Sequence, residues 1–314
     1  MRRRWRGPAL WLLGLFAAVA LAHGAQRASP LAEGVYLVQG SLGEADARNR
    51  GALGNSGFIA TPAGTVVIGT GGSYRLGREL LALAEHTTGR PVIAAVITQA
   101  RPEFLMGAAA FTDRGIEVIA HAETARLIAQ RCHVCLQRLR RALGDDAMAG
   151  TRLAAPTRRL AGSESLAPGG RRIELLHLGP GQTEGDLVVV DAATGIAFAG
   201  ALVTHARIPE LDTVGLAAPW RRALSALGAM PLRTLVPGYG APGEPRALIA
   251  ATEGYLARLE SEVQARLDAG SGLRAALDEV VLSEWRGWAQ YVPLHRRNVQ
   301  QQFLASEAMW AAGR

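Results

Sequence analysis

The sequence predicts an α/β (α+β) fold: a four-layer αββα sandwich in which two mixed β-sheets pack face to face and helices cover their outer sides. The 314 residues are 49% hydrophobic and 19% charged, which is enough to build a sizeable core. Each half of the chain also carries two short apolar runs around a turn, ending at Gly69 in the first half and Gly200 in the second. Two similar strand–hairpin–helix halves are typical of such a sandwich.

In the first half, short apolar runs rich in β-branched residues alternate with segments of helical periodicity. Pro62, Ala63 and Gly64 separate two of these runs as a hairpin turn, and Pro91 precedes the run that reads as a buried strand. We therefore expect strands at 35–39, 58–61, 65–68, 92–98 and 116–120, and helices at about 74–85, 105–111 and 122–143.

The second half predicts strands at 187–191 and 196–199 around a turn at 192–195, followed by a largely helical C-terminal third. The exported sequence as a whole contains no low-complexity segment and no long linker. We therefore expect residues 23–314 to form one domain with a helical C-terminal part.

The N-terminus has the pattern of a secretory signal. Four arginines precede the uncharged apolar run 9–22, which ends in the small residues Ala20 and Ala22. We expect residues 1–22 to be a signal peptide, cleaved after Ala22, and the protein to be periplasmic. The run is shorter than the roughly 20 residues of a membrane span, so we expect no stable span after cleavage. A retained, tilted anchor is the alternative.

Charge argues against a nucleic-acid partner. The formal net charge is +7, and removing the four arginines at positions 2, 3, 4 and 6 leaves 7 − 4 = +3 for the exported chain. No stripe of arginines alternates with aromatic residues, as a nucleic-acid surface requires.

A set of short motifs identifies a family. They are Asn55-Ser56-Gly57-Phe58, the loop from Thr98 to Phe104, Gly107–Phe111, Gly179–Asp186, Phe198-Ala199-Gly200-Ala201, Val236–Gly240 and His295–Val299. Together they resemble the metallo-β-lactamase superfamily over nearly the whole exported chain. The most similar branch is the zinc metallohydrolase of the quinoprotein relay system. The resemblance implies the αββα fold and a zinc hydrolase site on the loops that follow the strands.

The resemblance fails at the metal ligands themselves. The family's loop reads Thr-His-x-His-x-Asp-His, and this chain carries other side chains at these and the remaining ligand positions: Gln99, Arg101, Glu103, Phe104, Gln182, Ala201 and Tyr239. Only Glu103 is a conservative replacement. Zinc requires imidazole, thiolate or carboxylate ligands, and the permanent charge of an arginine repels a dication. We therefore expect no zinc and no other cofactor. Arg101 and Glu103 instead predict an ion pair within the pocket.

The two cysteines, Cys132 and Cys135, form a CxxC pattern on the apolar stripe of the predicted helix 122–143. They are interpreted as a disulfide formed after export, as two small buried thiols, or as a metal-binding pair. An oxidising compartment permits the first.

The resemblance implies a periplasmic protein of the class found with pyrroloquinoline-quinone-dependent alcohol oxidation in Gram-negative bacteria. Because the ligand positions are replaced, we expect a pseudoenzyme that binds a small molecule or a periplasmic partner protein, with no catalytic residue assigned. The alternatives are an active hydrolase with a non-standard site and a thiol–disulfide protein acting through Cys132 and Cys135.

The exported form is expected to begin near His23. Intact-mass measurement of protein from the periplasm tests this prediction. An unprocessed N-terminus recovered in a membrane fraction would show that the run 9–22 is an anchor.

Overall fold

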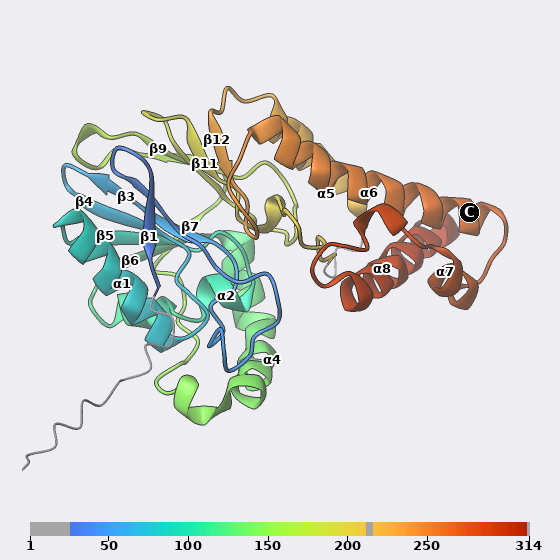
Figure 1. The fold of residues 1–314 in the computed structure, drawn as a ribbon, viewed down its shortest axis with the longest axis horizontal. Helices are drawn as coiled ribbons and strands as arrows, with labels where there is room; N and C mark the ends of the chain where they lie inside the picture. Colours follow the sequence, from blue (N-terminus) through green and yellow to red (C-terminus); the bar gives the residue numbers. More distant parts are fainter. Residues whose placement is uncertain (1–25, 212–215, 313–314) are drawn as a thin grey trace, which may run out of the picture.

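The computed structural model describes residues 26–211 and 216–312 (Figure 1). The expected signal peptide, residues 1–22, lies outside the described residues. Among those that are described, no helix is both long enough and apolar enough to cross a membrane.

The first sheet has seven strands within the described residues, in the order of the sequence. They are β1 (Ala28–Ala32), β2 (Val35–Val38), β3 (Ser56–Thr61), β4 (Gly64–Ile68), β5 (Val92–Val96), β6 (Glu117–His121) and β7 (Arg158–Leu160). The pairs from β1 to β4 are antiparallel and those from β4 to β7 are parallel. The parallel strands direct their carboxyl ends to one edge, where the predicted ligand loop begins.

The second sheet has five strands in the order β12-β11-β10-β9-β8 across the part of the chain that is described. They are β8 (Glu164–Leu166), β9 (Ile173–Leu176), β10 (Val188–Asp191), β11 (Ile196–Phe198) and β12 (Thr234–Val236). Only the pair β11–β12 is parallel. Both sheets are therefore mixed, as predicted.

Three apolar cores separate the layers. The central one joins the two sheets, with Ile59 and Val96 on one side and Val189 and Phe198 on the other. The outer face of the first sheet packs against α1 (Tyr74–Thr88), α3 (Ala108–Thr112) and α4 (Ala122–Ala147). The second packs against α5 (Ala217–Gly228), α6 (Pro245–Asp268) and α8 (Tyr291–Ala312). This arrangement confirms the αββα sandwich.

The C-terminal helices reach beyond the sheets. Figure 1 shows α6, α7 (Leu273–Glu279) and α8 extending past the edge of the sandwich, away from the first sheet. The remaining short elements are α2 (Pro102–Leu105) and three 3₁₀ turns at Pro168–Gly170, Gly200–Leu202 and Ser283–Trp285.

The helix predicted at 105–111 is instead divided into α2 and α3, and the prediction of one helix was wrong. Gly107 lies at the break because the chain passes against α1 there. A Cβ atom on Gly107 would lie 1.9 Å from the Thr70 carbonyl oxygen and 2.9 Å from the Gly77 Cα. This close backbone contact holds the junction of α2 and α3 against α1 and the loop that precedes it.

Gly107→Ala is expected to destabilise the protein by at least the roughly 1–3 kcal/mol of an overpacked core, because backbone atoms cannot move aside. Gly162→Ala is the control, since a Cβ atom there meets no atom within 4 Å. Denaturant unfolding of both variants measures the difference. Equal stability of the two variants would contradict the close packing at Gly107.

Candidate functional site

The loops that follow the strands meet at one edge of the sandwich. The segment after β5 runs through Thr98 and Gln99 into α2, whose N-terminal capping residue is Arg101 and whose first residue is Pro102. The Leu187 amide donates to the Thr98 carbonyl oxygen at 2.7 Å, which joins this segment to the loop before β10. Asn55 ties a third segment to them: its side-chain amide donates to the Pro237 and Gly240 carbonyl oxygens.

One side of this site is apolar and closed. Phe104, Ala201 and Tyr239 form a small buried cluster, in which the Phe104 and Tyr239 rings meet edge to face with centroids 5.9 Å apart. The Tyr239 hydroxyl donates to the carboxylate of Glu103. Burial, and then the negative charge of Glu103, raise the pKa of Tyr239 well above its ordinary value. Tyr239 therefore acts as a neutral hydrogen-bond donor.

Arginine side chains surround the other side. The Arg101 guanidinium forms an ion pair with Glu210, and Arg297 of α8 contacts the other oxygen of the same carboxylate. Arg207 lies with its Cζ 4.3 Å from the centre of the Tyr239 ring and donates to the Leu42 and Gly43 carbonyl oxygens. Two carboxylates and three guanidinium groups therefore share the site.

Glu210 is the buried charge at the centre of this cluster, with 5% of its side chain exposed. Burial alone would raise the pKa of its carboxyl group. The positive charges of Arg101, Arg297 and Arg207 outweigh that effect and hold the pKa below its ordinary value. The sequence had pointed to Glu103 as the partner of Arg101, and the structure adds an ion pair of Arg101 with Glu210, a residue that no motif had indicated.

The C-terminal motif places Glu210. Asn298 of α8 donates to the Pro209 carbonyl oxygen at 2.6 Å and accepts from the Leu211 amide at 2.9 Å. Tyr255 of α6 contacts both Asn298 and His295 through its hydroxyl group, at 2.9 and 3.0 Å. The motif His295–Val299 thus positions the loop of the site from a distant helix.

The remaining predicted positions, Gln99 and Gln182, are both buried. Ala100 donates to the Thr183 hydroxyl at 3.4 Å, which brings the two glutamine loops together. Asp186 holds the second loop by accepting from the backbone amides of Gln182 and Thr183, at 2.8 and 3.1 Å. Among the described residues, the Nε2 and Oε1 atoms of Gln99 have no hydrogen-bond partner. The Oε1 atom of Gln182 has none either. Such buried polar atoms call for a guest molecule or ordered water.

The structure also brings together two histidines that the sequence did not pair. The rings of His121 and His177 stack with centroids 4.1 Å apart, and His177 Nδ1 lies 3.1 Å from the Asp186 carbonyl oxygen. Burial, and then the charge of His177, lower the pKa of His121. Their separation of 56 positions leaves no local signal in the sequence.

Cys132 and Cys135 lie in α4 and are not joined by a disulfide; the first is buried and the second half-buried. Both side chains pack against the core between α4 and the first sheet. The predicted disulfide therefore stays a prediction about the oxidised protein.

The side chains at the seven positions do not fit zinc. A catalytic zinc site needs at least three imidazole, thiolate or carboxylate ligands. Of the seven side chains only Glu103 carries such a group, and it accepts the hydrogen bond of Tyr239. Within residues 26–211 and 216–312, no three His, Cys, Asp or Glu side chains gather as a metal site.

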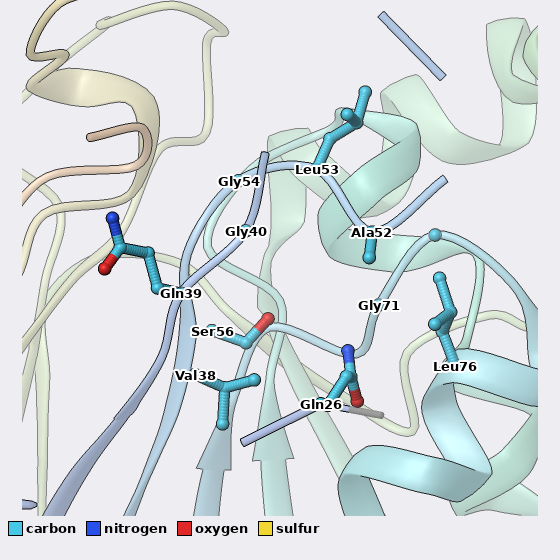
Figure 2. A pocket seen from close by; sticks show the side chains of 11 residues that line it. Gln26, Val38, Gln39, Gly40, Ala52, Leu53, Gly54, Ser56, Gly71 and Leu76 are labelled. Atoms are coloured by element: carbon cyan, nitrogen blue, oxygen red, sulfur yellow. The ribbon is translucent and has the colours of Figure 1, made fainter. Parts of the chain in front are cut away.

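A small pocket lies next to this site. Figure 2 shows Gln26, Val38, Ser56 and Leu76 around it. Gly54, which also lines it, backs onto the Phe104 ring. None of the seven predicted positions lines this pocket, so it lies beside the ligand positions and does not include them.

Comparison with known proteins supports the resemblance. The family model "Metallo-beta-lactamase superfamily" matches residues 50–239. A metallo-beta-lactamase from Pontibacter korlensis superposes with a TM-score of 0.60 at 21% identity, covering 74% of this chain and 99% of that one. One from Hirschia baltica gives a TM-score of 0.57 at 20% identity, covering 74% and 98%. FIM-1 from Pseudomonas aeruginosa, solved in its mono-zinc form, gives 0.58 at 19%, covering 76% and 98%. No curated protein matches the chain in sequence.

Glu210→Gln is expected to lower the free energy of unfolding by about 3–5 kcal/mol, because it removes the buried charge that pairs with Arg297 and with the largely covered Arg101. Because the folded-state pKa of Glu210 is lowered, its contribution is present above the ordinary pKa of 4.5 and is lost as the pH falls through the folded value. Denaturant unfolding between pH 3 and 7 measures both effects.

Glu253→Gln is the matched control. This carboxylate also accepts from an arginine, Arg221, but 37% of its side chain is exposed, and exposed pairs contribute only about 0–1 kcal/mol. A Glu210→Gln variant as stable as the control would contradict the buried cluster.

Proposed function

The chain belongs to the metallo-beta-lactamase superfamily, and we propose that it is a pseudoenzyme of that superfamily which binds a small polar ligand without zinc. The observation that carries this proposal is which side chains occupy the seven ligand positions and what those side chains contact. Arg101 forms an ion pair with Glu210, and the Tyr239 hydroxyl donates a hydrogen bond to Glu103. Gln99 and Gln182 retain polar atoms that no described residue satisfies.

The unsatisfied atoms define the chemistry of the ligand. Gln99 offers an amide donor and an amide acceptor, and Gln182 offers a further acceptor. The adjacent cluster has three guanidinium groups against the two carboxyl groups of Glu103 and Glu210, so it favours negative charge. A small hydroxy acid supplies hydroxyl donors together with a carboxylate, and we propose this class as the ligand.

The proposed compartment and role rest on the sequence. The basic start and the run 9–22 support export to the periplasm. The motif set supports kinship with the quinoprotein relay branch, and therefore an accessory role beside pyrroloquinoline-quinone-dependent alcohol oxidation. Oxidation of alcohols yields organic acids, which is the ligand class proposed for the site.

Elemental analysis of the purified full chain tests the loss of metal chemistry. We expect well under one zinc per chain after mild dialysis, and no hydrolysis of β-lactams or thioesters. Stoichiometric zinc that survives dialysis would overturn the pseudoenzyme and favour an active hydrolase with a non-standard site.

Thermal unfolding with glycolate, and with acetate for comparison, tests the ligand class. A ligand at 100 times its Kd stabilises the folded state by about 2.7 kcal/mol, a shift of several degrees in Tm. We expect the shift with glycolate to exceed that with acetate and to disappear in Gln99→Met. Gln137→Met, at an exposed site on α4, is the control and should keep it. An identical shift in both variants would place binding elsewhere.

A further inference from the structure

The CxxC pair of α4 has the arrangement of a reactive dithiol. Cys132 and Cys135 lie three positions apart and therefore on one face of the helix. Cys132 is 2% exposed and belongs to the same core as Leu105 and Ile128. Cys135 lies one turn further on, at the border of that core, where solvent reaches it. One sulfur is thus accessible and the other is held behind it.

The surroundings of Cys135 favour its thiolate. A hydrogen bond from the Cys132 thiol is the largest influence, and the positive charges of Arg101 and Arg138 add to it. Together they outweigh burial and the charge of Glu103 and lower the pKa of Cys135 from 9.0 to about 7. The thiolate is the nucleophile in cysteine chemistry. Near neutral pH, about half of the molecules would therefore carry Cys135 as the reactive thiolate.

We propose that Cys132 and Cys135 form a thiol–disulfide exchange site, with Cys135 as the attacking and Cys132 as the resolving cysteine. This proposal concerns cysteine chemistry, and it does not depend on the proposed binding of a ligand. Its reaction partner is a disulfide, carried either by a low-molecular-weight thiol or by another protein.

The reaction balances between the two dithiol–disulfide pairs. The Cys135 thiolate attacks one sulfur of the partner disulfide, a mixed disulfide forms, and the other partner sulfur leaves as a thiolate. Cys132 then loses its proton to solvent and attacks the Cys135 sulfur, and the second partner sulfur leaves. The cysteine pair loses two electrons and the partner gains them. The reverse sequence oxidises a partner dithiol.

Helix geometry makes the resulting disulfide easy to reduce again. Side chains three positions apart on a helix have Cβ atoms about 5–6 Å apart, whereas a disulfide joins Cβ atoms about 3.5–4.5 Å apart. Closing the bond requires the helical turn to tighten. Disulfides held under such constraint have more oxidising potentials and are labile, which suits exchange better than permanent cross-linking.

Incubation of the reduced full chain with oxidised glutathione, followed by intact-mass measurement, tests the proposal. We expect the wild type to form an internal disulfide, and Cys132→Ser to stop at one glutathione bound through Cys135. Cys135→Ser should react at least tenfold more slowly, because its remaining thiol is buried. A wild type that stays reduced in its folded state, yet reacts once unfolded, would overturn the proposal.

Alkylation of Cys135 as a function of pH separates a poised thiolate from mere exposure. In Cys132→Ser, which keeps a hydroxyl donor, the rate should rise with a midpoint near 7; in Cys132→Ala it should move toward 9.0. Comparing the rate of exchange with oxidised glutathione and the rate with a disulfide in a reporter protein distinguishes the two partner sources. Equal midpoints near 9.0 in both variants would contradict the role assigned to Cys132.

Discussion

The buried carboxylate of Glu210 is the constraint on which the site depends. A charge removed from water is tolerated only when opposite charges and hydrogen bonds surround it. Arg101 comes from the loop after β5 and Arg297 from α8, so neutralising this one group requires both segments to be in place. Glu210 therefore links the edge of the sandwich to the C-terminal helices, in addition to the hydrogen bonds that Asn298 makes to the same loop.

That geometry explains why motifs far apart in the sequence belong together. Asn55 contacts the segment that carries Tyr239, and Asn298 contacts the segment that carries Glu210. Each motif residue acts by positioning a neighbour, and neither requires a metal to do so. Packing and hydrogen bonding are therefore enough to hold this framework together, whatever chemistry its centre carries.

The sequence predicted the layers, most central strands and the region of the site, because these depend on local periodicity and on motifs. It did not predict β1, β7, β8, β9 or β12, which are short strands that no recognised hairpin turn flanks. Nor did it identify Glu210 or the stacked pair His121 and His177. Those contacts join residues brought close only by the packing of the sheets, and a charged residue in a loop has no pattern that distinguishes it from a solvated one.

In the proposed pseudoenzyme, side chains take the place of an ion, and this changes what the stability of the fold depends on. A bound metal stabilises a fold by mass action, in proportion to its free concentration and to the deprotonation of its ligands. The cluster of Arg101, Glu210 and Arg297 is covalently part of the chain, so its effective concentration never varies. In the proposed pseudoenzyme, folding would not depend on the supply of zinc, and a chelator would leave its stability unchanged.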